Sequence, residues 1–465
     1  MNSFVGTDTI CALSTPAGMG AIAVIRISGA DAFAICSRIF TPAEKELDLA
    51  SAPSHTIHFG RIGSGNDLLD EVLVSIFRSP HSYTGEDVIE ISCHGSTYIQ
   101  QKILELILSE GARMAKPGEF TLRAFLNNKF DLSQAEAVAD LILSHSKSSH
   151  DLAIRQMRGG FSETIRDLRR KLVDFTSLIE LELDFSEENI EFASRQDLTT
   201  LLNQLESEIK QLIDSFTIGN VIKNGIPVAI IGKPNVGKST LLNAILNEEK
   251  AIVSEIPGTT RDAIEDTIVI GGYSFRFIDT AGLRTARDKI ESIGIERTWE
   301  KINKASIILY VFDSSLCSFD DVMDSAGEFR ELISNTSKRM ILVGNKMDQL
   351  VELPHGFKDF VEYETIFVSA KRKENIHLLA ESLVNSIKID GLTDNTIVSN
   401  ARHLDALNHA LAAIEAIHAG LKSNIPPDLL TVEIRQALYH LGSITGEITT
   451  EEILGNIFGK FCIGK

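Results

Sequence analysis

The sequence predicts a multidomain α/β plus α fold, with an N-terminal α+β domain, a helical domain in two segments and an inserted α/β domain. Three observations favour this fold: a β-rich first stretch, long stripes of apolar residues at helical spacing, and a central alternation of strands and helices. The alternation predicts a parallel sheet with crossover helices. At 465 residues the chain exceeds one ordinary core, so two or three domains are expected.

The first 118 residues have a sequence pattern typical of a small α+β domain. Apolar and β-branched runs at 21–27, 72–77 and 88–93 predict strands, and the apolar spacing around 99–108 predicts a helix.

Helical spacing dominates two later segments. Leu168, Leu172, Phe175 and Ile179 recur at spacings of four, three and four, and a second stripe runs from 198 to 216. The same rhythm returns at 404–421, after a polar stretch at 390–396. These stripes indicate helix packing rather than a cofactor site. Because the first strand and the last helix of an α/β block of this type end near each other, we expect one helical domain from 119–216 and 389–465, with 217–388 inserted.

Composition excludes several classes of protein. Apolar residues make up 43% of the chain and charged residues 23%, a mixture typical of globular proteins. No apolar run approaches the ~18 residues that a membrane span requires. The N-terminus lacks a secretory pattern, so a cytoplasmic location is expected. Five scattered cysteines without a CxxC pair argue against a disulfide framework or a structural metal site.

The net charge of −19 disfavours nonspecific coating of nucleic acid, which requires clustered cations. One short basic run, Arg166, Arg169, Arg170 and Lys171, has two interpretations: a local binding patch or a solvated helix face.

The strongest motif follows the apolar run at 226–231. Residues 232–239 (GKPNVGKS) match G-x-x-x-x-G-K-[ST] between a predicted strand and helix. The glycines allow backbone N–H groups to surround a β-phosphate. Lys238 is expected to contact the β- and γ-phosphates, and Ser239 to bind Mg²⁺.

Three further motifs follow in order at strand ends: 279–282 (DTAG), 345–348 (NKMD) and 369–371 (SAK). Asp279 is expected to hold Mg²⁺ through water, and the Gly282 N–H to contact the γ-phosphate. The Asp348 carboxylate can accept hydrogen bonds from guanine N1 and N2, which adenine lacks; such discrimination amounts to roughly 1–3 kcal/mol or more. The four motifs together predict a guanine-nucleotide site.

Hydrolysis requires a switch and a group that orients water. Residues 258–262 (GTTRD) form the expected switch I, with Thr260 as a second Mg²⁺ ligand. Leu283 follows Gly282 and cannot orient water, so Arg284 and Glu291 are the candidates; alternatively they form a solvated pair. Transition-state charge requires an arginine or a monovalent cation near Asn235.

At this point the whole chain resembles the MnmE (TrmE) family of tRNA-modification GTPases. The motifs that carry the resemblance are 117–137 (PGEFTLRAFLNNKFDLSQAEA), 84–90 (TGEDVIE), 258–262 (GTTRD) and 461–465 (FCIGK). The resemblance implies an N-terminal folate-binding and dimerising domain, a discontinuous helical domain and an inserted Ras-like P-loop G domain. It also implies pairing of G domains across the dimer in the presence of potassium and GTP.

The resemblance further implies C5 modification of the tRNA wobble uridine with an FAD-dependent partner of the MnmG (GidA) family and a one-carbon unit from reduced folate. Glu291 would position the attacking water. Magnesium ligands would be Ser239 and Thr260, and potassium ligands Asn235, Ser254, Ile256 and Thr259. The 5-formyltetrahydrofolate ligands would be Arg26, Glu90, Lys129 and Lys465. Residues expected to contact GTP are Asn235, Val236, Gly237, Lys238, Ser239, Thr240, Ser254, Glu255, Ile256, Pro257, Gly258, Thr259, Thr260, Asp279, Thr280, Ala281, Gly282, Asn345, Lys346, Asp348, Ser369, Ala370 and Lys371.

Cys462 has two interpretations. It is a poor match to a prenylation signal, because Gly464 and Lys465 follow at the wrong places. The resemblance favours a catalytic thiol near the one-carbon site; the alternative is a structural tail cysteine. For the chain as a whole, the alternative function is a GTP-controlled interaction or RNA-assembly protein whose partner does the chemistry.

Overall fold

The computed structural model describes residues 8–44, 46–65, 67–184, 195–248, 266–278, 302–327, 338–350, 363–387, 396–423, 425 and 427–464. The chain divides into two compact units. The first comprises Met1–Ala139, Gln156–Glu206 and Ala406–Lys465, and the second Asp140–Arg155 and Ser207–Asp405.

The first unit contains a seven-stranded sheet of order β3-β4-β5-β6-β2-β1-β7. Its neighbouring strands are antiparallel except for the pair β1 and β7. The strands are β1 Ile10–Leu13, β2 Ile22–Ser28, β3 Phe40–Pro42, β4 Thr56–Ser64, β5 Asp67–Phe77, β6 Val88–His94 and β7 Arg113–Met114. Three of them confirm the strands expected at 21–27, 72–77 and 88–93.

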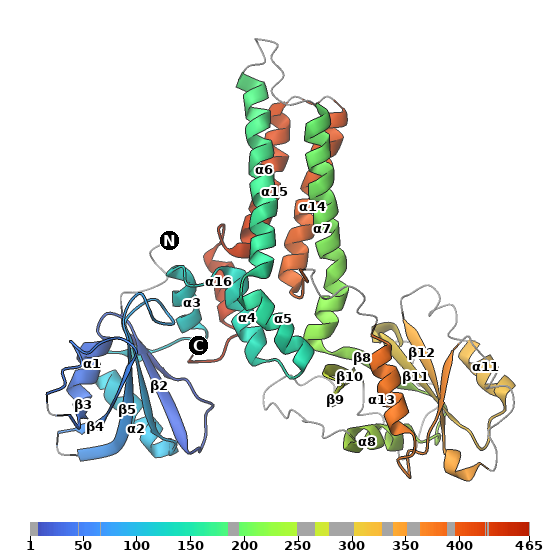
Figure 1. Ribbon diagram of the computed structural model, residues 1–465, viewed down its shortest axis with the longest axis horizontal. Helices are drawn as coiled ribbons and strands as arrows, with labels where there is room; N and C mark the ends of the chain where they lie inside the picture. Colours follow the sequence, from blue (N-terminus) through green and yellow to red (C-terminus); the bar gives the residue numbers. More distant parts are fainter. Residues whose placement is uncertain are drawn as a thin grey trace. The chain divides into compact units, whose positions relative to one another are not determined.

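Because side chains alternate between the two faces of a strand, one set of strand side chains packs against two helices in a hydrophobic core. Ala23, Ile25 and Ile27 of β2 point into this core, together with residues of α1 (Ala32–Ile39) and α2 (Thr97–Ser109). Both helices cover the same face of the sheet (Figure 1). The helix expected around 99–108 is therefore confirmed. Neither α1 nor α2 covers the opposite face of the sheet.

The helical segments confirm the predicted stripes. The helices are α3 Glu119–Leu126, α4 Leu132–Ile142, α5 Lys147–Met157, α6 Gly160–Asp184, α7 Arg195–Asn224, α14 Ala401–Lys422, α15 Pro427–Thr445 and α16 Glu451–Phe458. Leu168, Leu172 and Phe175 of α6 are fully buried, as are Leu202 and Ile209 of α7. α6 and α15 pack along each other (Figure 1).

The second unit contains a six-stranded sheet of order β13-β12-β11-β8-β10-β9. The strands are β8 Ile226–Ile231, β9 Asp266–Ile270, β10 Tyr273–Phe277, β11 Ile307–Asp313, β12 Arg339–Asn345 and β13 Glu364–Phe367. α8 (Lys238–Glu248) and α13 (Ile376–Asn385) pack on one face, and α11 (Phe319–Gly327) on the other. This is the layered arrangement that strand–helix alternation predicts.

The sheet is mixed, which corrects the expectation of a parallel sheet. β9 pairs antiparallel with β10 at the sheet edge, while the remaining pairs are parallel. Gly271 and Gly272 join β9 to β10 with φ values of 57° and 85°. Two consecutive residues of positive φ make a tight hairpin turn, and glycine adopts that conformation at little cost.

Three smaller findings concern boundaries and surfaces. α7 continues past residue 216 to Asn224, so the position expected for the domain boundary lies inside a helix. Among the described helices, none is both long and apolar enough to cross a membrane. In the basic run, Arg166 pairs with Asp131 at 2.6 Å and Arg169 pairs with Glu447. These pairings favour the interpretation of that run as a structural helix face.

Candidate functional site

The phosphate loop connects a buried strand to a helix N-terminus. All six residues of β8 are buried, and α8 begins at Lys238. Gly232 and Gly237 have φ values of 142° and 94°. A Cβ at Gly232 would lie 2.0 Å from the Val311 carbonyl oxygen, and one at Gly237 would lie 2.3 Å from Asn345 Nδ2. Both positions of the motif therefore require glycine for space and for backbone conformation.

The ammonium group of Lys238 is held by hydrogen bonds to the backbone of the phosphate loop. Lys238 Nζ donates to the carbonyl oxygens of Gly232 and Lys233, each at 2.7 Å. These carbonyls hold the ammonium group inside the concave side of the loop, where a β- or γ-phosphate can accept from it. Ser239 follows in the first turn of α8, where its hydroxyl can bind Mg²⁺ beside the phosphates.

Asn345 joins the phosphate loop to the base-recognition loop. Its Nδ2 donates to the Val236 carbonyl at 2.8 Å, and its Oδ1 accepts from the Ala370 N–H at 3.0 Å. The side chain is 3% exposed, so water does not compete for these bonds. Lys346 pairs with Asp313 at 2.6 Å and begins the short helix η2, Met347–Gln349.

The base-selecting carboxylate is pre-organised. Asp348 Oδ1 accepts a hydrogen bond from the Ser369 hydroxyl at 2.7 Å, and Arg372 Nε lies 3.8 Å from Oδ2. The Ser369 hydrogen bond lowers the pKa of Asp348, so the carboxylate is charged and accepts hydrogen bonds only. Guanine presents two adjacent donors, N1–H and the 2-amino group, which match these acceptors. The arrangement fits guanine better than adenine.

Val236 and Thr240 also lie in the described phosphate loop and first turn of α8, and Lys371 follows Ala370. The Mg²⁺ ligand Ser239 is described, whereas its expected companions are not. Outside the described residues lie Ser254, Glu255, Ile256, Pro257, Gly258, Thr259, Thr260, Asp279, Thr280, Ala281, Gly282, Leu283, Arg284, Glu291 and Lys465. In the described part of the chain, no group of three or more His, Cys, Asp or Glu side chains could hold a metal ion.

A second candidate site lies on the face of the N-terminal sheet that α1 and α2 leave uncovered. Arg26 of β2 and Glu90 of β6 are register partners. The guanidinium donates to Glu90 Oε1 from Nε at 2.9 Å and from Nη2 at 2.7 Å. Arg26 Cζ lies 5.0 Å from the Tyr83 ring centroid and 5.6 Å from that of Phe120. The pair is thus fixed between two aromatic rings.

Lys129 and the C-terminal tail approach the same region. Lys129 Nζ donates to the Pro80 carbonyl at 2.9 Å. The next residue, Phe130, has its ring 6.0 Å from Tyr83. Cys462 is exposed, and its carbonyl accepts from the Gly118 N–H at 3.4 Å.

The tail continues to the end of β1. The Ser14 hydroxyl donates to the Gly464 carbonyl at 3.3 Å, and a Cβ at Gly464 would lie 2.2 Å from the Leu13 carbonyl oxygen. The glycine of the tail therefore permits a close approach to the strand. By contrast, Cys11, Cys36 and Cys93 lie in the sheet core, where burial raises their thiol pKa values. They are ordinary core residues, as expected.

A buried ion network supports this site, and sequence reasoning missed it. Arg123 is 1% exposed and pairs with Glu86 at 3.0 Å, Asp8 at 3.2 Å and Glu119 at 3.3 Å. Arg113 also pairs with Asp8 and Glu119. The network ties α3, which carries Phe120, to the loop after Tyr83. In the sequence, the charged residues that lie among the apolar ones of segment 117–137 could have indicated this network.

Sequence reasoning also missed Tyr83 and the bridging role of Asn345. Tyr83 directly precedes the segment 84–90, and its hydroxyl lies 2.9 Å from the Thr121 hydroxyl. The position of Tyr83 beside that motif could have identified it from the sequence. The Asn345 bridge could not be identified in this way, because it joins residues that lie far apart in the sequence.

Comparison with known proteins finds family models and relatives that cover most of the chain. A family model described as the MnmE helical domain matches residues 132–462, and one described as the GTP-binding protein TrmE N-terminus matches residues 9–129. The tRNA modification GTPase MnmE of Flavobacterium psychrophilum is 54% identical over 462 residues, covering 98% of this chain and 99% of that protein.

Two further relatives carry the same name. That of Bacteroides fragilis is 52% identical over 467 residues, covering 98% of this chain and 99% of its own length. That of Cytophaga hutchinsonii is 51% identical over 461 residues, covering 99% of this chain and 98% of its own length. On this identity over the full length, the chain belongs to the MnmE family of tRNA modification GTPases and is a GTP hydrolase.

Proposed function

We propose that the chain is a potassium-stimulated GTPase that modifies C5 of the wobble uridine in certain tRNAs. It would use a one-carbon unit from a reduced folate and act with an FAD-dependent MnmG-type partner in the cytoplasm. The observation that carries this proposal is the fixed pair of Arg26 and Glu90 beside the tail that holds Cys462. The same chain carries a phosphate loop and, on a separate loop, the Asp348 carboxylate that matches the donors of guanine.

The chemistry of the sheet site fits a reduced folate. The pterin ring offers adjacent N–H donors that suit a carboxylate, and a carbonyl that suits a guanidinium. Both Arg26 bonds use Glu90 Oε1, so Oε2 remains to accept from a ligand. Lys129 and Lys465 would bind the glutamate carboxylates. 5-Formyltetrahydrofolate is therefore the expected ligand.

Direct titration tests this part of the proposal. Glu90→Gln keeps the shape of the side chain and removes the charge that pairs with Arg26. Isothermal calorimetry with 5-formyltetrahydrofolate should show weaker binding by roughly tenfold or more, because a charged hydrogen bond contributes about 1.5–3 kcal/mol. Glu71→Gln on the exposed β4–β5 pair is the matched control. Equal affinity of Glu90→Gln and wild type would contradict the folate assignment.

The uncovered face of the N-terminal sheet supports homodimerisation through this domain. Phe59 and Leu73 are register partners and are 51% and 45% exposed; Ile57, one pair along, is 66% exposed. The rows Ile57–Ser75–Glu90–Arg26 and Phe59–Leu73–Ser92–Val24 lie on one face. A contiguous apolar face of this kind is typical of an interface. A second copy would cover it, next to the folate pair.

Potassium would act at the phosphate loop. Asn235 is exposed at φ 63° inside the loop, and its side-chain amide carries an oxygen that can bind a cation. It would share the ion with Ser254, Ile256 and Thr259, and GTP with potassium would pair the G domains of the dimer. Glu291 would position the attacking water, with Ser239 and Thr260 on Mg²⁺.

GTP hydrolysis in potassium and in sodium tests this arrangement. We expect strong stimulation by potassium in the wild type and a large loss of rate in Glu291→Ala. Equal rates in both salts would remove the cation from the mechanism.

The alternative function is a GTP-controlled interaction or RNA-assembly protein whose partner does the chemistry. Cys462→Ser separates the two, because loss of tRNA modification with normal GTP hydrolysis favours direct chemistry by this chain. Lys460→Ala, an unrelated change in the same tail, is the control. The division into domains at 1–118, 119–216 with 389–465, and 217–388 remains part of the proposal.

A further inference from the structure

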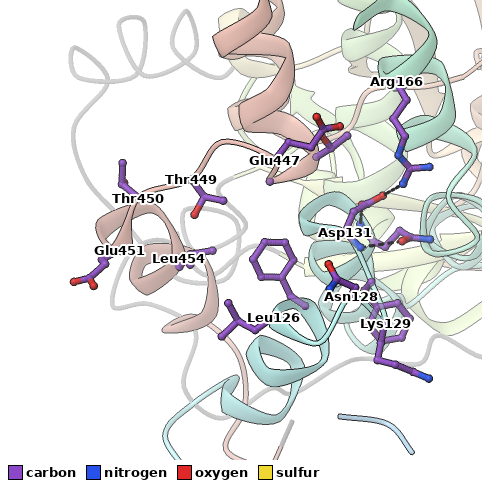
Figure 2. Close-up of a pocket in the computed structure, with 15 residues that line it drawn as sticks. Leu126, Asn128, Lys129, Asp131, Arg166, Glu447, Thr449, Thr450, Glu451 and Leu454 are labelled. Carbon is purple, nitrogen blue, oxygen red and sulfur yellow. Dashed lines mark hydrogen bonds and ion pairs between the residues drawn. The ribbon is translucent and has the colours of Figure 1, made fainter. Parts of the chain in front are cut away.

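A cavity of about 540 Å³ lies in the first unit, between the α3–α4 segment, α6 and the loop that joins α15 to α16. Its size is within the range typical of small-molecule sites. None of the residues expected to contact GTP lines it, and Lys129 is the only predicted folate residue that does. Figure 2 shows Leu126 and Leu454 toward one end of the cavity, and Asn128, Asp131 and Arg166 toward the other.

The apolar part of the lining offers flat surfaces. Phe125, Phe130, Leu126 and Leu454 contribute it. Phe125 is also fixed from behind by Phe458 of α16, with ring centroids 6.4 Å apart. Two half-buried phenyl rings in one cavity suit a planar ligand, because each unsaturated ring can stack on a phenyl face.

Two neutral polar groups remain available in the cavity. Among the described residues, the Asn128 amide and the Thr449 hydroxyl have no hydrogen-bond partner. Asn128 has a φ of 55°, a left-handed conformation that asparagine tolerates. Its amide presents one acceptor and two donors, which match the edge of a nucleic-acid base.

The carboxylates of the lining are already engaged. Asp131 accepts from Arg166 Nη2 at 2.6 Å and from the Ser162 hydroxyl at 2.9 Å. Glu447 pairs with Arg169. Glu451, the third carboxylate of the lining, also has an interaction partner. The cavity therefore does not present a bare anionic surface.

Two aromatic rings connect the cavity to the Arg26–Glu90 pair. Phe130, which lines the cavity, lies 6.0 Å from Tyr83, and Tyr83 lies over Arg26 at 5.0 Å. A base stacked on Phe130 would therefore be separated from the Arg26–Glu90 pair by two aromatic rings, Phe130 and Tyr83. The cavity and the proposed folate site are thus neighbours in the same unit.

From these contacts we propose that the cavity receives the target uridine of the tRNA, turned out of the anticodon loop. Its base stacks on Phe125 or Phe130, and the Asn128 amide pairs with the N3–H and O4 edge. This inference rests on the proposed function and adds to it a substrate pocket.

The first test locates the base without any protein variant. An anticodon stem-loop RNA with 5-iodouridine at the wobble position is irradiated on the full chain, and the cross-linked peptide is identified by mass spectrometry. We expect the adduct on Phe125 or Phe130. RNA binding with the adduct elsewhere overturns the inference and leaves the proposed function intact. Absence of any RNA binding overturns the inference and the tRNA part of the proposed function together.

The second test uses base preference. Asn128→Asp replaces a donor and acceptor by an acceptor alone, which can no longer donate to uracil O4 but can accept from the cytosine amino group. We expect uridine stem-loop binding to weaken by about 10- to 100-fold, with a smaller loss when cytidine occupies the same position.

Asn408→Asp, an exposed position on α14 outside the lining, carries the same added charge and should leave both affinities unchanged. Equal losses for the two RNAs, or a similar loss in the Asn408 variant, would assign the effect to charge alone and overturn base recognition. Tight folate binding by Asn128→Asp establishes that its N-terminal unit is folded.

Discussion

The most informative perturbation of the nucleotide site is Asp348→Asn. The side chain of Asp348 is 10% exposed, and its Oδ1 is held by Ser369 at 2.7 Å. An asparagine fits the same space and can keep the Ser369 hydrogen bond. It replaces one acceptor oxygen by an amide donor, which would face the 2-amino donor of guanine. The rest of the site is unchanged.

The magnitude follows from the bonds that change. The carboxylate would accept from guanine N1–H and from the 2-amino group, and each charged hydrogen bond contributes about 1.5–3 kcal/mol. The variant loses the 2-amino bond and the charge on the other, so we expect a cost of about 3 kcal/mol, or roughly 100-fold in affinity. Xanthine carries a carbonyl in place of the 2-amino group, which the new amide can donate to.

Calorimetric titration with GDP and XDP measures both effects. The wild type should bind GDP far more tightly than XDP, and the variant should reverse that order. Glu374→Gln removes a neighbouring charge 4.0 Å from Arg372 and should leave both affinities within about twofold. Retention of GDP affinity by Asp348→Asn, or loss of both nucleotides, would refute the assignment of this carboxylate to the base.

Three further outcomes are expected. Gly237→Ala should abolish GDP binding in a fluorescence titration, because the new methyl lies 2.3 Å from Asn345 Nδ2 at a φ of 94°. Arg123→Met should lower the stability of the N-terminal unit by about 3 kcal/mol, seen as faster amide exchange in β2 and β6, because the buried Glu119 carboxylate loses a partner. Arg113→Met should cost less, because Arg113 is 37% exposed. Burial raises the pKa of Glu119, but the hydrogen bonds from Arg113 and the Lys116 N–H, together with the charges of Arg113 and Arg123, outweigh burial and the pKa is lowered. This stabilisation is complete above the ordinary value of 4.5 and is lost as pH falls through the folded-state pKa, so acid unfolding of this unit should be steeper in wild type than in Glu119→Gln.

The phosphate loop could be predicted from the sequence because its geometry is local. Gly232 and Gly237 shape the backbone of one short loop, and Lys238 Nζ donates to a carbonyl of that same loop, so their spacing along the chain sets their spacing in the loop. The base motif at Asp348 behaves similarly, since it follows the end of one strand. Strands and amphipathic helices could also be predicted from the sequence, because alternation and helical periodicity of apolar residues reflect burial on one face.

Contacts between distant segments could not be predicted in the same way. The hairpin at Gly271 turned an expected parallel sheet into a mixed one, and the buried hub at Arg123 joins residues from three separate segments. The resemblance suggested Arg26 and Glu90 as ligands, but their direct pairing depends on the register of β2 against β6.

The sequence alone determined that this chain binds a guanine nucleotide and to which family its motifs correspond. Tertiary structure decided that Asn345 links the phosphate and base loops, that Tyr83 covers Arg26, and that a cavity opens beside Phe130. The physical reason is that a local motif specifies its own backbone. Packing and strand register, by contrast, are set by free energies summed over residues far apart in the chain.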